Sequence, residues 1–257
     1  MEEKLYYDSS DGIKLCGLLS KVNSSDNIVI LCHGLLSNKK SSCFNFLVKK
    51  FQAEKINSFR FDFRSLGESE GIDYEMTPTK EIIDLESTIN YLKSIGFDKI
   101  ILLGSSFGGG IVSLLDYDRF KCIKGIVCWY AGLDYSISTN DNQYFIKEHS
   151  EIAKKNGWFK IERNAGKIYR LGKELFEEVY QLVPYKNLIK VDLPILFVHG
   201  LIDKMVPYEL SVKVSNMCKN SKLELIENGD HSFKNNEKAL IKACNVTIQF
   251  IKEIFNN

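Results

Sequence analysis

The chain has 257 residues, of which 44% are hydrophobic and 26% are charged, and its formal net charge at pH 7 is +1. This length is enough for one α/β domain with a large core. The near-zero net charge gives no electrostatic reason to expect a nucleic-acid partner, and no apolar run approaches the roughly 18 residues of a membrane helix. We therefore expect a single domain over residues 1–257 with no membrane span.

The N-terminal sequence and the cysteines indicate a compartment. Met1 to Leu5 is acidic and leads directly into strand-like sequence, which is not the pattern of a secretory signal. The seven cysteines are an odd number and include no C-x-x-C pair, which favours reduced thiols and gives no sign of a zinc site. We expect a cytoplasmic protein without a metal or other cofactor, and the sequence does not indicate its oligomeric state.

Strand and helix patterns alternate along most of the chain. We expect an opening hairpin from Leu5–Tyr7 and Ile13–Lys21, followed by a buried strand at Ile28–Cys32. Further strands are predicted at Ile56–Phe61, Lys99–Leu103, Ile123–Trp129, Ile195–Val198 and Lys222–Ile226, and helices at Ser42–Glu54, Pro78–Ile95, Phe107–Leu115, Tyr208–Met217 and Glu237–Phe255. Repeated strand–helix crossovers predict an α/β fold with a mainly parallel central sheet and helices on both faces.

One long segment interrupts this alternation. From about Leu133 to Tyr185 the chain is too long for a simple crossover, whose loops usually have about 2–6 residues, so we expect a small inserted cap subdomain over residues 133–187. General burial tendencies favour packing as the role of each aromatic residue in the cap, but a few of them should border a substrate pocket. The aromatic residues of this segment are Tyr135, Tyr144, Phe145, Trp158, Phe159, Tyr169, Phe176, Tyr180 and Tyr185.

A serine flanked by glycines follows the predicted strand at Lys99–Leu103. Gly104 to Gly108 reads G-x-S-x-G, the pattern that holds a nucleophilic serine on a tight turn between a strand and a helix. Ser106 occupies the central position and is the candidate nucleophile, whereas Ser105 is expected to pack locally. A phosphate-binding helix start is the alternative, but the lysine of a P-loop and the spacing of a dinucleotide-binding motif are both missing.

A serine hydroxyl needs a base to become a good nucleophile, and the chain has four histidines. His231 lies in a turn-rich loop between a predicted strand and the last helix, where a catalytic base is expected. His33 and His199 each precede a glycine at the end of an apolar strand, so we expect them to shape loops. His149 lies in a polar region and is expected to be solvated.

The candidate acid is Asp203, which follows the predicted strand at Ile195–Val198. The chain order Ser106, Asp203, His231 is that of α/β-hydrolases and differs from the order in chymotrypsin-like and subtilisin-like enzymes. Asp230 is the main competitor for this role, although adjacent side chains in an extended loop tend to point apart.

These motifs together resemble those of serine hydrolases of the α/β-hydrolase superfamily. The resemblance covers nearly the whole chain and includes His33-Gly34-Leu35, Arg60 to Ser69, Gly104 to Gly108, Gly200 to Asp203, and Gly229 to His231. Asp62 to Ser69 is similar to a structural D-x-R-G-x-G-x-S loop of the family, with Ser65 where glycine is usual. The inserted segment resembles that of cinnamoyl and feruloyl esterases, and related lipases and peptidases also carry insertions there.

The resemblance implies an oxyanion hole and a reaction. In this fold one donor is the amide of the residue after the nucleophile, here Phe107, and similarity to His-Gly loops of the family makes the amide of Leu35 the second. The implied function is that of a serine carboxylesterase acting on small esters with an aromatic, cinnamoyl-type or short acyl group. An acylpeptidase, an amidase or a monoacylglycerol lipase-like hydrolase could use the same triad, and a non-catalytic ligand-binding protein could use the same scaffold.

Overall fold

A single eight-stranded sheet forms the centre of the molecule. The computed structural model describes residues 2–135, 147–163 and 166–256. The strands lie in the order β1-β2-β4-β3-β5-β6-β9-β10. β1 pairs antiparallel with β2, and β2 with β4, while the other neighbours are parallel. The strands are β1 (Glu3–Asp8), β2 (Lys14–Ser20), β3 (Asn27–Cys32), β4 (Ser58–Asp62), β5 (Lys99–Ser105), β6 (Ile123–Trp129), β9 (Ile195–Gly200) and β10 (Ser221–Ile226).

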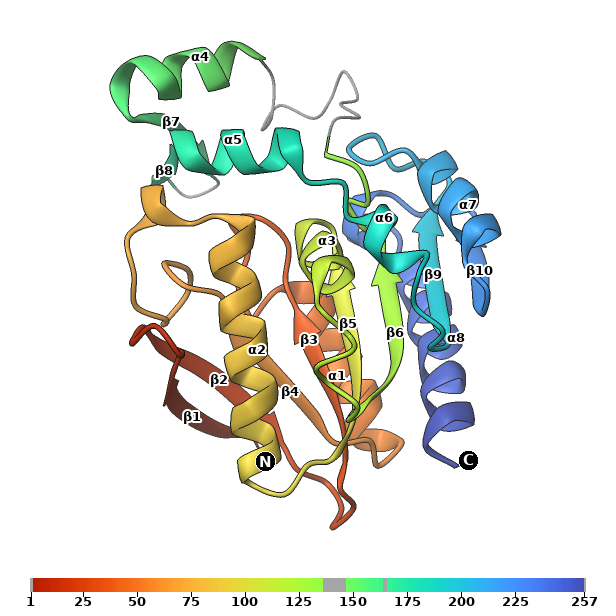
Figure 1. Cartoon of the computed structure of the whole chain (residues 1–257). Coiled ribbons are helices and arrows are strands. Elements are labelled where there is room, and N and C mark those ends of the chain that lie inside the picture. The colour runs from red at the N-terminus through yellow and green to blue at the C-terminus, as the bar shows by residue number, and fades with distance from the viewer. Residues whose placement is uncertain (1, 136–146, 164–165, 257) are drawn as a thin grey trace.

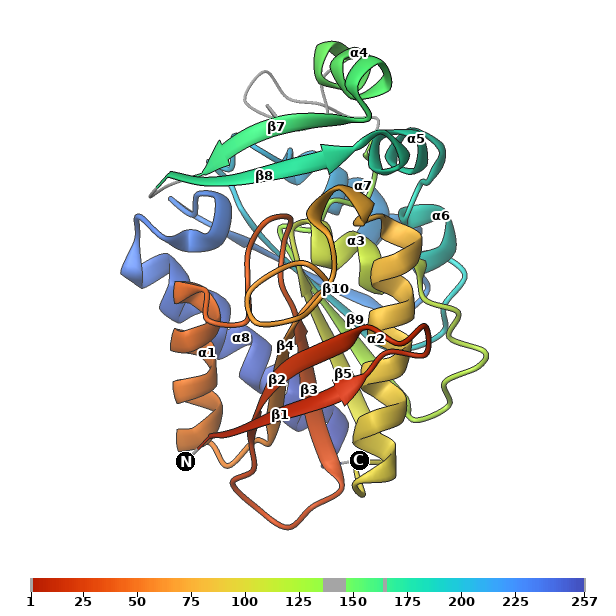
Figure 2. The ribbon, with the colours of Figure 1, turned by 90° about the vertical axis from the view of Figure 1, so that its left-hand side faces the viewer.

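Helices cover both faces of this sheet (Figures 1 and 2). α1 (Ser42–Ala53) and α8 (Glu237–Phe255) pack on one face, and α2 (Pro78–Ser94), α3 (Phe107–Leu114) and α7 (Tyr208–Met217) pack on the other. Side chains alternate between the two cores along each strand, so Ile30 of β3 joins one core and its neighbours Val29 and Leu31 join the other. The predicted α/β fold with a mainly parallel sheet is confirmed.

Most predicted element boundaries agree with the structure to within two residues. β4 begins at Ser58 rather than Ile56. The side chain of Asn57, directly before it, accepts a hydrogen bond from the amide of Val22 at 2.8 Å. β5 and β9 run two residues further than predicted, to Ser105 and Gly200. None of the helices in the described ranges is long and apolar enough to cross a membrane.

A separate layer lies over the carboxyl ends of the parallel strands (Figure 1). It contains α4 (Lys147–Asn156), the antiparallel pair β7 (Trp158–Arg163) and β8 (Lys167–Gly172), and α5 (Lys173–Gln181), and α6 (Tyr185–Leu188) leads back to the sheet. The sequence predicted a cap over residues 133–187 but no elements within it. Residues 136–146 and 164–165, with Tyr144 and Phe145 among them, lie outside the described residues.

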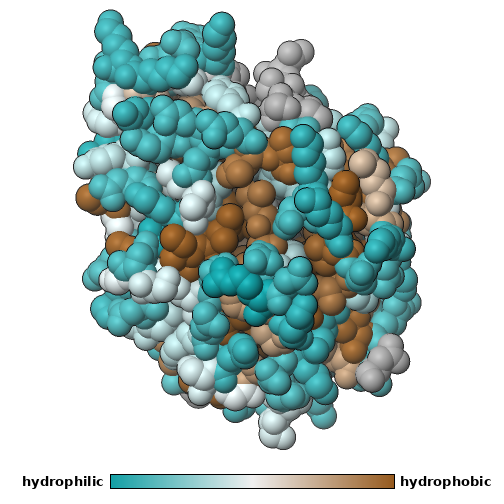
Figure 3. Space-filling model, viewed as in Figure 1, coloured by the Kyte–Doolittle hydropathy of each residue, from teal (hydrophilic) through white to brown (hydrophobic). Residues whose placement is uncertain are grey.

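This layer is amphipathic, and an ion pair is among the contacts that join it to the rest of the protein. α5 buries Leu175, Phe176 and Val179, whereas hydrophilic side chains cover the outer surface of α4 and α5 and hydrophobic ones gather below them (Figure 3). Arg170 of β8 forms a 2.7 Å ion pair with Asp73 of the body. His149, which was expected to be solvated, is partly buried, and its ring stacks on that of Phe159 with the ring centroids 3.7 Å apart.

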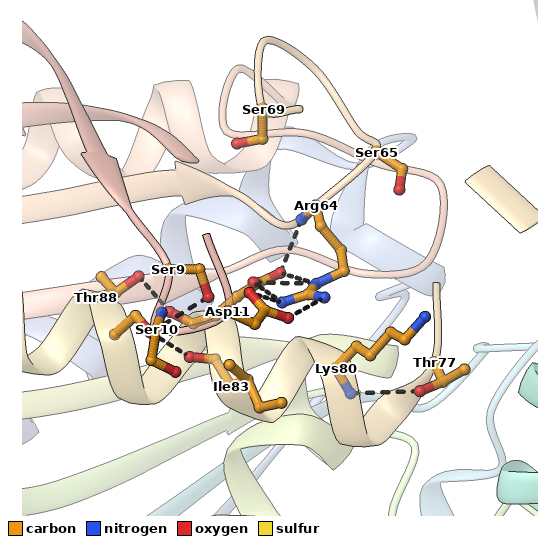
Figure 4. Close-up of polar contacts among 12 residues, drawn as sticks. Ser9, Ser10, Asp11, Arg64, Ser65, Ser69, Thr77, Lys80, Ile83 and Thr88 are labelled. Atoms are coloured by element: carbon orange, nitrogen blue, oxygen red, sulfur yellow. Dashed lines mark hydrogen bonds and ion pairs between the residues drawn. The ribbon is translucent and has the colours of Figure 1, made fainter. Parts of the chain in front are cut away.

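The loop after β4 is fixed by a buried arginine (Figure 4). Arg64 forms ion pairs of 2.7 Å with Asp84 of α2 and 2.8 Å with Asp11 of the opening hairpin. Ser65 adopts a left-handed backbone with φ of 66°, and its hydroxyl donates to the carbonyl of Ile72 at 2.9 Å. Serine thus holds a left-handed backbone at this position, a conformation that favours glycine and strains a residue with a side chain.

Candidate active site

Ser106 stands on a sharp turn between β5 and α3. Its backbone has φ of 53° and ψ of −122°, a strained conformation for a residue with a side chain. The flanking glycines permit the turn, since a Cβ on Gly104 would lie 2.5 Å from the carbonyl oxygen of Gly108. A Cβ on Gly108 would lie 2.3 Å from the carbonyl oxygen of His33. Without side chains at these two positions, α3 packs directly against the strands and the Ser106 hydroxyl is exposed at their ends.

The structure brings Ser106, His231 and Asp203 into one hydrogen-bonded chain. The Ser106 Oγ lies 3.1 Å from His231 Nε2, and His231 Nδ1 lies 2.8 Å from Asp203 Oδ2. Since the carboxylate accepts, Nδ1 carries the proton and Nε2 accepts from the serine hydroxyl. The competing acid, Asp230, points elsewhere and accepts a 2.5 Å hydrogen bond from the side chain of Asn235.

The loop that carries His231 is held by two close contacts. Phe233 is fully buried and packs edge-to-face on Trp129 and Tyr130, with ring centroids 5.6 and 5.3 Å away. The loop also touches the end of β9, since a Cβ on Gly200 would lie 2.0 Å from the carbonyl oxygen of Gly229. These contacts bring the histidine loop against the loop that carries the acid.

Asp203 is a buried and fully hydrogen-bonded carboxylate. Its Oδ1 accepts from the amides of Met205 at 2.8 Å and Val206 at 3.0 Å. Its Oδ2 accepts from His231 and also lies 3.3 Å from Nε2 of His199. Burial alone would raise the pKa of this carboxyl, but the hydrogen bonds from His199 and His231 outweigh burial and hold its pKa well below the usual range. Asp203 is therefore ionised at neutral pH.

The loop after β3 reaches the nucleophile from the opposite side. A Cβ on Gly34 would lie 3.0 Å from Cβ of Ser106, so glycine at this position lets the loop approach. Leu35 and Phe107, the two predicted oxyanion donors, both line the cavity above Ser106. His33 fixes the start of the loop, because its Nδ1–H donates to the carbonyl of Gly34 at 2.9 Å and its Nε2 accepts from the amide of Phe63 at 3.1 Å. Burial lowers the pKa of His33, which keeps it neutral.

A cavity of about 410 Å³ opens above the triad. One part of its wall is apolar and contains Phe107, Tyr135, Val206, Pro207 and Leu210, whereas the loop after β3 contributes Ser37, Ser41 and Ser42. Arg163 at the end of β7 also lines it. Among the cap aromatics, Tyr135 borders this cavity, while Trp158 lines a different cleft and Tyr169 and Phe176 are buried. In the described ranges, no three side chains of His, Cys, Asp or Glu form a group suited to a metal ion.

Two residues near the triad were not singled out as functional by the sequence. Tyr130 lies directly after β6 in a left-handed conformation with φ of 36°, and its ring meets that of His231 edge-to-face at 4.7 Å. Nothing in the sequence marks this residue, because the contact depends on β6 lying beside β9 in the sheet. His199 did carry a signal, since His199-Gly200 repeats the pattern of His33-Gly34 at the end of another buried strand.

Comparisons with known proteins give the same fold. Est1E from Butyrivibrio proteoclasticus, solved with ferulic acid bound, superimposes with a TM-score of 0.80 at 22% identity over 98% of this chain and all of that one. A monoacylglycerol lipase from Paleococcus ferrophilus superimposes with a TM-score of 0.73 at 15% identity over 98% of both chains. At these identities the likeness establishes the fold and leaves the substrate open.

Sequence comparisons identify the family. The bovine mitochondrial palmitoyl-protein thioesterase ABHD10 is 29% identical over 192 residues, which is 74% of this chain and 61% of that protein. The match thus spans less than two thirds of the bovine protein. The family model described as serine aminopeptidase, S33, matches residues 23–158, more than half of the chain. The protein is therefore a serine hydrolase of the α/β-hydrolase superfamily and belongs to the serine aminopeptidase S33 family.

Proposed function

We propose that this protein is a carboxylesterase that works through an acyl-serine intermediate. The observation that carries the proposal is the hydrogen-bonded chain from Ser106 through His231 to Asp203, with distances of 3.1 and 2.8 Å. Both distances are within the reach that proton transfer and nucleophile activation require. The apolar wall of the adjacent cavity supplies a surface on which an acyl group can bind.

The first half-reaction forms the acyl-enzyme. The Ser106 Oγ attacks the ester carbonyl while its proton moves to Nε2 of His231, and the ionised Asp203 stabilises the imidazolium and holds its Nδ1 proton. The amides of Leu35 and Phe107 donate to the oxyanion that develops on the former carbonyl oxygen. Each such donor contributes about 2.7–4 kcal/mol to lowering the barrier.

The second half-reaction releases the acid. The first half-reaction has ended with His231 giving the proton from Nε2 to the alcohol as the alcohol departs, and Nε2 now accepts a proton from a water molecule that attacks the acyl group. The tetrahedral oxyanion forms again between the same two amides, and its collapse returns the proton to the Ser106 Oγ. One histidine thus serves in both steps, which requires that its position relative to the nucleophile does not change.

The cavity favours esters with an aromatic or other apolar acyl group. Its volume of about 410 Å³ lies in the range of about 300–1,000 Å³ that is usual for small-molecule sites. Phe107 and Tyr135, whose ring centroids lie 5.1 Å apart, provide an aromatic surface beside the nucleophile. Est1E, which shares this fold, binds ferulic acid, and a cinnamoyl-type acyl group is accordingly the substrate class we propose.

The direct test compares kcat/KM for methyl ferulate and p-nitrophenyl butyrate, with Ser106→Ala as the blank. A preference for the ferulate supports an aromatic acyl site, whereas turnover of the butyrate alone points to a short-chain esterase. If neither ester is hydrolysed above the blank, the carboxylesterase proposal is wrong.

We also propose that residues 133–187 act as a cap that selects the acyl group. The support is that Tyr135, near the start of this segment, and Arg163, at the end of β7, both line the cavity. Tyr135→Leu should lower the ratio of ferulate to butyrate turnover. Tyr180→Leu is the matched control, since Tyr180 is 44% exposed and does not line the cavity, and an equal change in both variants would contradict the proposal.

Thioester hydrolysis is the second candidate, because the bovine relative is named a palmitoyl-protein thioesterase. The same acyl-serine chemistry applies, but a thiolate leaves more readily than an alkoxide and depends less on proton donation by His231. The family description also names an aminopeptidase. An oxygen ester, a thioester and an amide of one acyl group, compared by kcat/KM, separate the three activities.

A further inference from the structure

We propose that His199 is a positioning residue for the catalytic acid: it fixes the Asp203 carboxylate to the end of β9 and thereby sets the orientation of His231. This proposal rests on the proposed function in so far as it concerns turnover. The geometry that supports it concerns the charged pair of Asp203 and His231 and does not depend on the identity of the substrate.

His199 is a polar residue at a buried position of β9, where packing alone would favour an apolar residue. It is fully buried, as are Phe197 and Val198 before it in β9. Burying an imidazole costs free energy unless its nitrogens find hydrogen-bond partners. A role in holding other polar groups accounts for histidine at this position.

Both ring nitrogens of His199 have partners. Nε2 lies 3.0 Å from the carbonyl oxygen of Val206 and 3.3 Å from Oδ2 of Asp203. Both of these atoms are acceptors at neutral pH, so Nε2 carries the proton and is shared between them. Nδ1 lies 2.7 Å from the hydroxyl of Ser211 in α7 and accepts from it. His199 therefore joins β9, the acid loop and α7.

The two carboxylate oxygens of Asp203 are held in different ways. Oδ1 accepts from the amides of Met205 and Val206, which belong to the same loop and move with it. Oδ2 contacts His231, from a partly exposed loop, and His199, from the central sheet. Among the described contacts of the carboxylate, the one with His199 connects it to the rigid strand.

His199 acts through Asp203 and not on the substrate. It does not line the cavity above Ser106, and its contact with the triad is with the acid. Among the described residues, the ionisable side chains near Asp203 include His199 from β9, His231 from the loop after β10 and Tyr130 after β6. Removing His199 should therefore lower kcat and leave KM nearly unchanged.

The decisive variant is His199→Phe, which keeps the ring and removes both nitrogens. We expect kcat to fall about 10- to 100-fold, as for the loss of a hydrogen bond to a charged group. The acid limb of the pH profile of kcat/KM should move to higher pH. Without the hydrogen bond from His199, the negative charge of Asp203 acts on His231 alone and stabilises the protonated form of that imidazole more strongly. In His199→Gln the amide nitrogen can occupy the place of Nε2, so this variant should recover most of the loss.

Val198→Ala is the matched control for a general loss of stability. Val198 is fully buried in the same strand and belongs to the core on the other face of the sheet. This variant should lower the melting temperature without changing kcat or the pH profile. If it reduces kcat as much as His199→Phe does, or if folded His199→Phe keeps wild-type kcat and pH profile, the proposed role of His199 is wrong.

A spectroscopic readout separates this proposal from the esterase proposal. The proton between Nδ1 of His231 and Asp203 gives a far-downfield proton NMR signal in the free enzyme, whatever the substrate. We expect this signal to shift or broaden in His199→Phe and to return in His199→Gln. An unchanged signal in His199→Phe overturns the positioning role, whereas absent ester turnover in the wild type with a signal that responds to His199 overturns the esterase proposal alone.

Discussion

The loops after β3 and β9 begin alike and do different work. A buried histidine followed by a glycine stands at each strand end: His33-Gly34 directly after β3, and His199-Gly200 as the last two residues of β9. In the first loop, His33 donates a hydrogen bond to the carbonyl of Gly34, and this places a segment of backbone against Ser106. In the second loop, His199 lies beside the carboxylate of Asp203, and this contact orients the Asp203 side chain. The His-Gly pattern thus positions a backbone amide in the loop after β3 and the Asp203 carboxylate in the loop after β9.

The far ends of the two loops also differ. The loop after β3 is anchored by Lys39, whose buried ammonium group pairs with Asp62 and lies 3.1 Å from Glu68. The loop after β9 closes on its own acid, because the amides of Met205 and Val206 donate to Asp203. The loop after β3 is therefore held by the ion pair between Lys39 and Asp62. The loop after β9 is held by hydrogen bonds to the side chain of its own Asp203. Substitution of Lys39 in the first loop should consequently affect stability, and substitution of Asp203 in the second should affect turnover.

The largest effect should come from Asp203→Asn in the second loop. The amide keeps the size of the side chain but removes the charge that stabilises the imidazolium, so kcat should fall by about 10⁴-fold. Asp230→Asn is the control, because Asp230 bonds Asn235 and not the histidine. Steady-state kinetics of both variants test the assignment, and similar losses in the two would contradict it.

The next largest effect should come from Gly34→Ala in the first loop. The new methyl group would lie 3.0 Å from Cβ of Ser106 and would push the oxyanion donor away, so kcat should fall about 10²- to 10³-fold. In Gly96→Ala the new methyl meets nothing within 4 Å, and although the φ of 100° there strains any residue other than glycine, kcat of the folded protein should not change. An unaffected kcat in folded Gly34→Ala would rule out this loop as part of the oxyanion hole.

Lys39→Met should change stability more than turnover. The substitution leaves the buried Asp62 without its ammonium partner, and breaking a buried pair on one side costs about 3–5 kcal/mol. Lys40→Met removes an exposed ammonium group from the same Glu68 and should cost at most about 1 kcal/mol. Urea unfolding measures both, and equal losses would mean that burial of Lys39 does not stabilise the loop.

The smallest effect concerns pH. Because burial lowers the pKa of His33, the unfolded chain binds a proton near pH 6.5 that the folded protein does not. Stability should therefore fall as the pH drops below about 6.5, by at most about 1.4 kcal/mol per pH unit for this group. His33→Gln should show a weaker dependence in urea unfolding between pH 7.5 and 5.5. The same slope in both proteins would assign the effect to other groups.

The sequence predicted the main fold and singled out the three residues that the structure joins by hydrogen bonds, because each has a local pattern. Ser106 lies in a spaced glycine motif, and Asp203 and His231 follow apolar strands. Since parallel strands end at one edge of a sheet, residues that follow such strands come together. What the sequence left open was the choice between Asp203 and Asp230, which the turn of Asp230 toward Asn235 resolves.

Other features could not be predicted, for physical reasons. The cap elements are short, and elements of that length take their stability from packing rather than from a periodic pattern. Tyr130 meets His231 because β6 and β9 are neighbours in the sheet, which local sequence does not reveal. The contact of His199 with Asp203 likewise depends on how the loop folds back over the end of its strand.

The position of the cap segment in the chain affects how the protein can evolve. The reacting side chains follow β5, β9 and β10, whereas the cap is inserted after β6. Insertions, deletions and recombination can therefore replace the segment over the cavity without altering the codons of the reacting groups. Proteins that descend from one ancestor can therefore act on new substrates while the reaction chemistry stays the same.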